Sequence, residues 1–389
     1  MNKLKYILST SGKFLYFEIG RILHQRNQLV KIICGYPSIK LKKEKVPSKF
    51  IISSGIYNIL KYPFLSFPKL NSYINFMSIL NKKNIDRLVC NFLDKNNDAD
   101  VLIGLSGVSL NSAKKILNKK KIFICDRTSS HIVYQNNLLA EEYKINNRKF
   151  FRTHNWFIEN ELKEYEMADI ILVPSNFVKN SFDKETSKKT KVLNFGVNTQ
   201  NFFKDLNIKK SEKYFDILFI GQISLRKGLH YLIEAFHKFK HPNKRLHIVG
   251  SHTLDKDFFE DKIKHDKITY YGHVDHLKLN NIINKSHVLV LPSIEEGFAT
   301  VVLQAIAAGC PVIVSENTGA FEFVKNNKCG YSVPIRDGSA ITDKLEILAE
   351  NKNLLDEFSN NAAACMPNNT WSNYTDKLDE LITEYKQNK

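Results

Sequence analysis

The chain has 389 residues, of which 43% are hydrophobic and 25% are charged, and its formal net charge at pH 7 is +17. This length suits two domains of ordinary size, and the composition is normal for a soluble globular protein. No apolar run of roughly 18 uncharged residues is present, so we predict no transmembrane helix. The apolar stretch at the N-terminus is short and has charge on both sides, which argues against a signal peptide.

The six cysteines are scattered along the chain, without a CxxC pair and without histidines at a spacing suited to zinc. We therefore predict no metal site. Several of the cysteines lie in apolar surroundings, so we expect free, mostly buried thiols in a reducing cytosol.

The positive charge is unevenly distributed along the chain. Residues 1–200 contain 33 Lys and Arg against 16 Asp and Glu, whereas residues 201–389 contain 24 of each. An anionic partner of the N-terminal half would explain this asymmetry, and so would a Lys- and Asn-rich surface that is merely solvated. Among anionic partners a membrane surface is favoured, and we predict no nucleic acid partner.

Residues 37–83 are the reason for favouring a membrane. The basic stretch KLKKEKVPSK is followed there by aromatic residues interleaved with lysine, isoleucine and leucine. Such a mixture suits a surface that lies in the plane of a membrane. It also suits helices whose apolar side lies in a core, with lysine stems covering apolar surface.

The first half begins with a strand at residues 6–9, a helix at about 14–26 and a strand at 29–34, which is a βαβ start. Gly12 lies in the first turn, where the absence of a side chain lets the backbone approach a ligand or another domain. Further strands are predicted at residues 101–105, 121–125, 169–173 and 192–195.

A polar cluster at residues 126–131 follows the strand at 121–125, and α/β folds place their reactive groups at such strand ends. His131 could serve a reaction, or it could only cap a helix or face solvent. Asp126 and Arg127 could likewise pair with each other as part of the scaffold.

Residues 198–213 are polar and unpatterned and form the predicted linker. A second βα series follows, with strands predicted at residues 215–220, 246–249, 267–271, 287–291, 311–314 and 330–333. We predict an α/β fold with two Rossmann-like doubly wound domains facing across a cleft. The N-terminal domain spans residues 1–205 and the C-terminal domain spans residues 206–370. A C-terminal helix at about residues 371–389 is expected to pack back on the N-terminal domain.

Arg226 and Lys227, in the segment SLRKG, lie at a strand-to-helix turn of the second domain. Phosphate binding uses this combination, because arginine offers a forked contact, lysine a point charge and the helix start its free N–H groups. No GxxxxGK[ST] pattern is present, which argues against a kinase or ATPase. The alternative, two solvated cations at a helix start, would work against the helix dipole.

Residues 286–314 are predicted to form a strand, a loop, a helix and a second strand. Glu296 lies at the N-terminus of this helix, where a carboxylate suits sugar hydroxyls better than a phosphate. Gln304 follows eight residues later, on the order of 10 Å away if the span is helical. That distance resembles the one between the sugar and the ribose of a nucleotide-sugar. Gln304 could also be only a polar residue on a core helix.

Several segments in a fixed order support a resemblance. The C-terminal half contains FIGQISLRKGLHYLIEAF, LHIVGS, ITYYGHV, LVLPSIEEGFATVVLQAIAAGCPVIVS and ENTGAFEFV, and the N-terminal half contains ICDRTSSHIVYQ, ADIILVPSNFVKNSF and NFGVNTQNF. With these segments the chain resembles a family-4 glycosyltransferase of the GT-B fold, from the glycosyl transferases group 1 clan. The match covers most of the C-terminal half and is sparser in the N-terminal half.

The resemblance implies roles for individual residues. Glu296 corresponds to the glutamate that contacts donor-sugar hydroxyls, Arg226 and Lys227 correspond to the phosphate-binding cations, and His131 corresponds to a histidine near the donor sugar. We group these four as the expected catalytic residues. The expected donor-binding residues are Gly12, Gly221, Ser224, His273, Val274, Ser293, Gly297, Phe298, Ala299, Thr300 and Gln304. Among them, the backbone after Glu296 would face the phosphates and the backbone at residues 273–274 would hold the base.

The resulting hypothesis is a retaining glycosyltransferase without a metal or other cofactor. Its partners would be a nucleotide-sugar donor and a glycan or lipid-linked acceptor of cell-surface polysaccharide or lipopolysaccharide synthesis. We expect a cytoplasmic location, with peripheral binding to the inner face of the membrane as a further possibility. Gln304 stands where the family usually has a second glutamate, and Gln222 where relatives often have arginine. They leave open an alternative, a non-catalytic family member that binds a ligand or partner.

Overall fold

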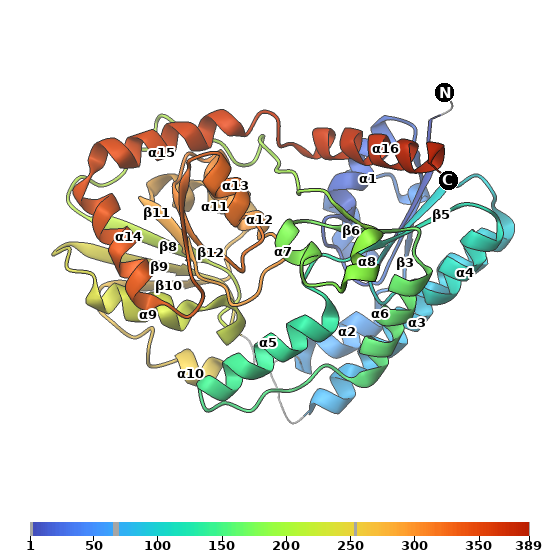
Figure 1. The fold of residues 1–389 in the computed structure, drawn as a ribbon, viewed down its shortest axis with the longest axis horizontal. Coiled ribbons are helices and arrows are strands. Elements are labelled where there is room, and N and C mark those ends of the chain that lie inside the picture. Colours follow the sequence, from blue (N-terminus) through green and yellow to red (C-terminus); the bar gives the residue numbers. More distant parts are fainter. Residues whose placement is uncertain (1–2, 65–69, 253–254, 389) are drawn as a thin grey trace. The chain divides into compact units, whose positions relative to one another are not determined.

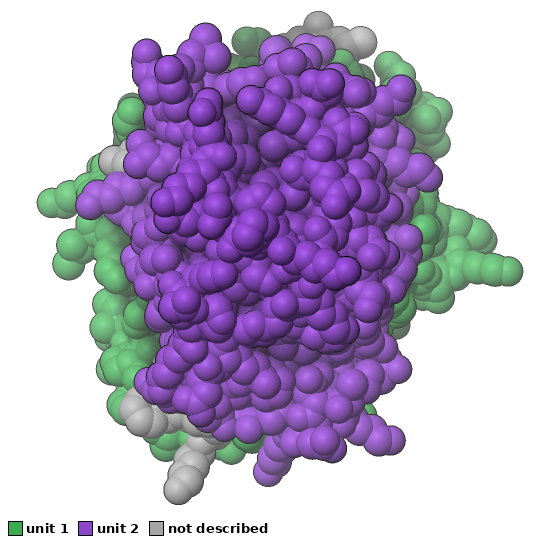
Figure 2. Space-filling view, turned by 90° about the vertical axis from the view of Figure 1, so that its left-hand side faces the viewer, with its two compact units in different colours: residues 1–136, 151–194, 371–389 green, residues 137–150, 195–370 purple. Residues whose placement is uncertain are grey.

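The computed structural model describes residues 3–64, 70–252 and 255–388. The chain forms two compact α/β units, each built on one parallel sheet (Figure 1). Unit 1 comprises residues 1–136, 151–194 and 371–389, and unit 2 comprises residues 137–150 and 195–370 (Figure 2).

Unit 1 contains a seven-stranded sheet in the order β3-β2-β1-β4-β5-β6-β7. The strands are β1 Tyr6–Thr10, β2 Leu29–Cys34, β3 Ile51–Ser53, β4 Val101–Leu105, β5 Ile122–Asp126, β6 Ile170–Val173 and β7 Thr190–Val192. The four consecutive strands β1, β4, β5 and β6 are buried along their whole length, as expected for apolar runs covered on both faces.

Helices cover the sheet of unit 1 in two layers. They are α1 Tyr16–Gln25, α2 Ile56–Lys61, α3 Asn71–Lys95, α4 Leu110–Asn118, α6 Asn155–Met167, α7 Asn176–Lys179, α8 Lys184–Lys188 and α16 Trp371–Gln387. Helix α1 packs on α16, whereas α4 packs on both α3 and α6. The helix α5 Ile132–Ile145 begins in unit 1 and continues into unit 2.

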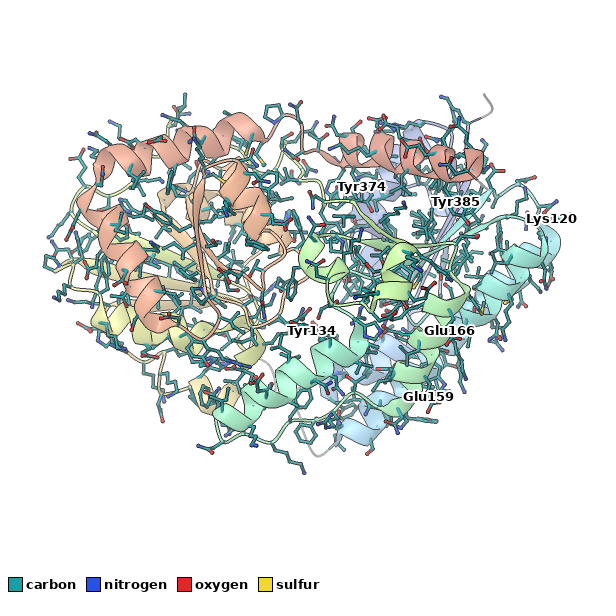
Figure 3. All side chains as sticks on the ribbon, in the orientation of Figure 1. Lys120, Tyr134, Glu159, Glu166, Tyr374 and Tyr385 are labelled. Atoms are coloured by element: carbon teal, nitrogen blue, oxygen red, sulfur yellow. The ribbon has the colours of Figure 1, made fainter. Side chains whose placement is uncertain are left out.

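The C-terminal helix α16 belongs to unit 1, although it is far in sequence from the rest of that unit. Asp376 on this helix lies 2.7 Å from Arg26 at the end of α1. Tyr385, near the end of α16 (Figure 3), donates a hydrogen bond of 2.7 Å to Asp169 before β6. These contacts tie α16 to the end of α1 and to the residue before β6.

Unit 2 contains a six-stranded sheet in the order β10-β9-β8-β11-β12-β13. The strands are β8 Phe215–Ile220, β9 Lys244–Val249, β10 Ile268–Gly272, β11 Val288–Leu291, β12 Val312–Ser315 and β13 Gly330–Val333. The helices are α9 Leu229–Lys238, α10 Lys256–Phe259, α11 His276–Lys285, α12 Thr300–Ala307, α13 Phe321–Asn326, α14 Gly338–Glu350 and α15 Lys352–Cys365. The predicted α/β class with two Rossmann-like domains is therefore confirmed.

The expected domain boundary, between residues 205 and 206, falls inside unit 2. The N–H of Val197 donates to the carbonyl of Asn369 at 2.9 Å, and the buried ring of Phe202 lies against His276. Residues 195–205 therefore pack on unit 2 in spite of their polar, linker-like sequence. The strand predicted at residues 192–195 is also displaced, because β7 ends at Val192 and the chain leaves the sheet there.

One strand of the fold was not anticipated from the sequence. The edge strand β3 lies within the segment 37–83, where a basic and aromatic composition suggested helices or a membrane surface. Among the residues described, no helix combines the length and the apolar character needed to cross a membrane.

Asp216, at the start of β8, should make the stability of the protein fall in acid. Its buried carboxylate lies 2.6 Å from Nε of Arg245 and 2.9 Å from Nε2 of His247. Burial opposes ionisation, but the hydrogen bonds of His247 and Arg245 outweigh it and lower the pKa of Asp216 to about 2.

Because the folded-state pKa lies below the unfolded value, this stabilisation is complete above about pH 4 and is lost as the pH falls toward 2. We expect Asp216→Asn to lose about 2 kcal/mol at pH 7. In thermal unfolding, the gap between wild type and variant should narrow below pH 4. A gap that stays constant with pH would contradict this assignment, and Asp261→Asn, at an exposed carboxylate, is the matched control.

Candidate functional site

The centre of the unit 2 sheet is a topological switch point. The chain enters at β8, adds β9 and β10 on one side, and then returns to add β11, β12 and β13 on the other. In such sheets the loops after the two central strands diverge and leave a crevice at the carboxyl ends. Residues 221–228 follow β8 and residues 292–299 follow β11, so the two segments that the sequence singled out meet at this point.

Two cations and two carboxylates form one cluster there. Arg226 donates from Nε to the carboxylate of Glu295 at 2.9 Å and to the Glu295 carbonyl at 3.1 Å. Lys227 forms an ion pair with Glu296, and Nη2 of Arg226 lies 3.9 Å from the Glu296 carboxylate. The formal charges of the cluster cancel, so its cations already have partners in this structure.

The backbones of the two loops are joined to each other. The N–H of Ile294 donates to the carbonyl of Arg226 at 2.8 Å. Gly228 has φ +67°, and a Cβ on it would lie 1.9 Å from the carbonyl oxygen of Pro292. Only glycine permits this approach, so the residue after the cation pair is fixed by packing against the second loop.

Buried polar groups behind the loops fix them further. Asp255, only 2% exposed, accepts hydrogen bonds from the N–H of Leu225 at 3.0 Å and from the hydroxyl of Tyr143 at 2.8 Å. On the other loop, the amide of Asn317 donates to the carbonyl of Ile294 at 3.0 Å. These hydrogen bonds therefore hold in place the backbone that carries the cations and the acids.

The loop that carries Glu296 is also paired with residues 317–319. The N–H of Glu296 donates to the carbonyl of Asn317 at 3.0 Å, and the carbonyl of Glu296 accepts from the N–H of Gly319 at 2.8 Å. Ala299 then precedes α12 with φ 62° and ψ 84° and supplies no side-chain cap. The N-terminus of α12, which includes Thr300, thus directly follows the acidic loop and Gly297.

The other expected donor-binding residues of unit 2 differ in exposure. Ser224 and Ser293 are buried, and Oγ of Ser293 has no hydrogen-bond partner in the described part of the chain. Phe298 is buried against Phe195, with ring centres 5.7 Å apart. Ser293 is therefore an available polar group beneath the loop, whereas Phe298 contributes packing.

The remaining expected residues lie at the sheet edge and on α12. Gly221 directly follows β8, and His273 and Val274 directly follow β10, with His273 exposed. Nε2 of Gln304, on α12, lies 3.4 Å from Nε2 of His276 at the start of α11. Gln304 is thus not a residue of the helix core.

His131 and Gly12 belong to unit 1. Nδ1 of His131 accepts from the N–H of Val133 at 3.4 Å, which caps α5, and its ring packs on Tyr165 and Phe182. Burial and then the charge of Arg127 lower the pKa of His131. The lowered pKa favours the neutral imidazole, and an accepting Nδ1 places the ring hydrogen on Nε2. The structure thus agrees with the interpretation that His131 caps a helix, which is one part of its role.

Asp126 and Arg127, which could have paired with each other, have different partners in the structure. Nη1 of Arg127 lies 2.8 Å from the carboxylate of Glu161, and Asp126 accepts from the hydroxyl of Tyr16 at 2.9 Å. Burial raises the pKa of Asp126 to about 7. Both residues serve the interior of unit 1.

Sequence reasoning missed Glu295, Asp255 and Asn317. The adjacent acids of the loop were recognised, but nothing in the sequence indicates which one turns inward. Glu295 is fully buried and holds Arg226, whereas Glu296 keeps 14% of its side chain exposed. The segment ENTGAFEFV, which contains Asn317, contributed to the resemblance without a role for that residue.

Comparisons with known proteins place this region of unit 2 in a family context. Residues 199–364 match the family model described as glycosyl transferases group 1. The uncharacterized glycosyltransferase MJ1607 of Methanocaldococcus jannaschii is 31% identical over 189 residues, which are 43% of this chain and 47% of that protein. The capsular polysaccharide biosynthesis glycosyltransferase CapM of Staphylococcus aureus is 27% identical over 232 residues, which are 55% of this chain and 60% of CapM. The matched region thus spans about half the length of these curated relatives.

A solved structure resembles the whole chain. Alr3699/HepE of Anabaena in complex with UDP has a TM-score of 0.71 and 13% identity, and the alignment covers 98% of this chain and 100% of that one. At this identity the likeness concerns the fold, which is GT-B. The region that matches the glycosyl transferases group 1 model, residues 199–364, lies within unit 2.

Proposed function

We propose that this protein is a retaining glycosyltransferase. It moves a sugar from a nucleotide-diphosphate donor to a glycan or lipid-linked acceptor in cell-surface polysaccharide or lipopolysaccharide synthesis. The observation that carries the proposal is the cluster of Arg226, Lys227, Glu295 and Glu296 at the switch point of unit 2. It lies inside the region that matches the family, and CapM is a relative with a polysaccharide-forming role.

In this proposal the donor diphosphate replaces Glu296 as the partner of Lys227. The displaced carboxylate then accepts hydrogen bonds from hydroxyls of the donor sugar. Arg226 stays oriented by the buried Glu295 and, with Lys227 and the N-terminus of α12, stabilises the charge that develops on the leaving diphosphate. Because these groups are held before the donor binds, little reorganisation is needed during the reaction.

The remaining expected residues have supporting roles. The neutral imidazole of His131 presents Nε2–H as a donor to the sugar, since Nδ1 is engaged at the start of α5. Gly12 leaves the first loop of unit 1 open to the substrates. The backbone at His273 and Val274 holds the base, and Gln304 contacts the ribose through its amide.

The direct test is a thermal-shift screen with a panel of sugar nucleotides, followed by an assay of nucleotide release. A bound donor raises the melting temperature by mass action, by an amount that grows with its concentration. Release of nucleotide that depends on an added glycan or lipid-linked acceptor would support the enzyme. Gln304 and Gln222 motivate the rival, a non-catalytic family member, which predicts donor binding without release.

Charge compensation by Arg226, Lys227 and α12 leaves no role for a metal ion, so we expect activity to survive chelation. Treatment with excess EDTA should change kcat by less than about twofold, because two cations and a helix N-terminus already face the diphosphate. A loss of activity that added Mg²⁺ or Mn²⁺ restores would contradict this assignment.

We also propose that unit 1 binds the inner face of the cell membrane through an apolar patch. By this patch we mean the large exposed side chains between residues 39 and 76, which are Ile39, Ile56, Ile59, Leu60, Tyr62, Phe64, Leu70 and Phe76. Exposed lysines flank it, and Nζ of Lys40 lies 5.6 Å from the ring centre of Tyr62. Apolar side chains bordered by cations suit an anionic bilayer surface.

The patch predicts binding to vesicles that contain anionic lipids, with a bound fraction that falls as salt is added. Replacing Ile59 and Leu60 together by serine should weaken binding roughly tenfold, because two aliphatic side chains no longer leave water. Ile347→Ser, at an exposed isoleucine of unit 2, is the matched control. An absence of binding at low salt would refute the membrane assignment.

A further inference from the structure

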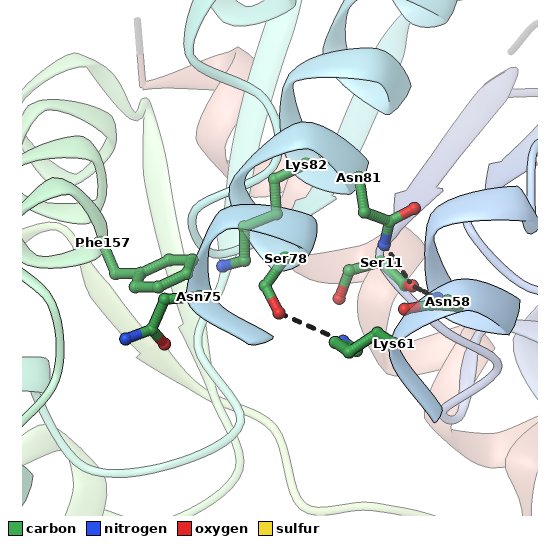
Figure 4. Close-up of a pocket in the computed structure, with 8 residues that line it drawn as sticks. All are labelled: Ser11, Asn58, Lys61, Asn75, Ser78, Asn81, Lys82 and Phe157. Carbon is green, nitrogen blue, oxygen red and sulfur yellow. Dashed lines mark hydrogen bonds between the residues drawn. The ribbon is translucent and has the colours of Figure 1, made fainter. Parts of the chain in front are cut away.

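Unit 1 has its own topological switch point, between β1 and β4, and a cavity of about 300 Å³ lies near it (Figure 4). The cavity is lined by the β1–α1 loop, by α2 and α3, and by one ring from α6. The lining residues are Ser11, Asn58, Lys61, Asn75, Ser78, Asn81, Lys82 and Phe157. Their side chains are mainly amides, hydroxyls and ammonium groups, which suits a ligand rich in hydroxyls.

Two amides fix the loop that forms one wall of the cavity. Nδ2 of Asn58, from α2, and Nδ2 of Asn81, from α3, donate to the carbonyl of Ser11 at 2.9 and 3.1 Å (Figure 4). Asn81 is only 2% exposed, and its Oδ1 has no hydrogen-bond partner within the described residues. The wall is therefore built before any ligand binds.

Lys61 brings a positive charge to this wall that no described carboxylate neutralises. Its Nζ donates to the hydroxyl of Ser78 at 3.2 Å, and the described residues place no carboxylate within ion-pair distance of it. Burial, and then the charge of Lys82, lower the pKa of Lys61. A cation in these surroundings gains from any anion that enters the cavity.

Lys82 adds a second, weakly compensated charge. Its Nζ donates to the carbonyl of Ser106 at 3.3 Å and lies 4.0 Å from the carboxylate of Glu161. That carboxylate is already paired with Arg127 at 2.8 Å and accepts from the hydroxyl of Tyr165. The side chain of Lys82 is 17% exposed, so the surrounding water screens its charge only in part.

We propose that this cavity is the acceptor subsite and that it binds a sugar bearing an anionic group, a phosphate or a carboxylate, held between Lys61 and Lys82. This inference rests on the proposed function, because it supplies the acceptor that the transfer needs. The position of α2 agrees with a phosphate that links a sugar to a lipid. Asn58 and Lys61 of that helix line the cavity, whereas Ile56, Ile59 and Leu60 belong to the apolar patch.

The test is calorimetric titration of the full chain with hexose 1-phosphate, hexuronate, neutral hexose and inorganic phosphate. We expect one or both anionic sugars to bind at least about tenfold more tightly than neutral hexose, because a charge-assisted hydrogen bond contributes more than the roughly 1.4 kcal/mol that a tenfold ratio requires. Which anionic sugar binds more tightly distinguishes phosphate from carboxylate. If neither anionic sugar bound more tightly than inorganic phosphate, the site would be an adventitious ion site only, and the proposal would be overturned.

Variants separate this cavity from the donor site. Lys61→Gln and Lys82→Gln should each weaken binding of the anionic sugar about tenfold and leave UDP affinity unchanged. Lys227→Met should weaken UDP binding and leave binding of the anionic sugar unchanged. Lys61→Arg, which keeps the charge, should retain binding and controls for folding. Lys95→Gln, at an exposed lysine about 20 Å further along α3, is the matched control.

The failure of each proposal is recognisable. If UDP binds but the anionic sugar does not, or binds equally well to Lys61→Gln, the acceptor subsite is refuted and the transferase proposal remains. If no sugar nucleotide binds while the anionic sugar does so through Lys61, the proposed function fails and an anion-binding cavity remains.

Discussion

Lys227→Met is expected to lower kcat/KM for sugar transfer by roughly 10²–10³-fold, the usual cost of removing one preorganised group that stabilises transition-state charge. The side chain of Lys227 is only 15% exposed and ends at Glu296, so its charge acts with little screening by water. Lys238→Met on α9 is the matched control, because that lysine is 52% exposed and pairs with Glu234 at the surface. The activity of Lys238→Met should differ from that of wild type by less than about twofold, as expected for the loss of a surface ion pair.

The affinity for nucleotide distinguishes this mechanism from a purely structural effect. If the diphosphate competes with Glu296 for Lys227, Lys227→Met should bind UDP more weakly. Glu296→Ala should bind UDP at least as tightly as wild type, because it frees the cation. Both variants should lose transfer. Equal weakening of UDP binding in both variants, or a melting temperature lowered only by Lys227→Met, would contradict the competition.

The sheets were predictable because their strands are nearly continuous apolar runs. VLIGL in β4, IFICD in β5 and FDILFI in β8 are buried along their length, so their composition alone distinguishes them from amphipathic helices. The short edge strand β3 has no such run, since its residues are half-buried. Edge strands depend on the neighbour they pair with, which a single sequence does not display.

The chemistry of the donor loops was predictable to the level of residue types. Arg226 and Lys227 at a strand-to-helix turn, and an acid before a glycine, indicated where charge would gather. The partner of each cation was not predictable, because Glu295 and Glu296 are adjacent and their directions follow from the contacts of the loop with Asn317 and Gly319.

The cavity of unit 1 was beyond sequence reasoning for a different reason. Its amides and ammonium groups come from separate elements, and Asn58 of α2 and Asn81 of α3 meet at the carbonyl of Ser11. Composition identified the segment 37–83 as basic and aromatic but did not divide α2 into a polar face and an apolar one. That division arises from packing against α3.

Glu295→Ala is expected to destabilise the protein by about 3 kcal/mol, at the lower end of the cost of breaking a buried ion pair. The carboxylate of Glu295 is fully buried and lies 2.9 Å from Nε of Arg226. The side chain of Arg226 is 29% exposed, so water can solvate part of its charge once Glu295 is removed. The loss of stability is therefore smaller than it would be for a fully buried arginine. Urea unfolding measures the change, and Glu185→Ala, at an 82% exposed surface pair, should change stability by less than about 0.5 kcal/mol.

A double-mutant cycle with Arg226→Met separates the ion pair from the volume of the side chain. Removing both charges should cost less than the sum of the two single changes, because neither charge is then left without its partner. Glu295→Ala should also lower kcat at temperatures where the variant is folded, since Nε of Arg226 would no longer be held by the Glu295 carboxylate. If instead the folded variant kept full activity, Arg226 would need no orientation by Glu295, and the buried acid would serve the fold alone.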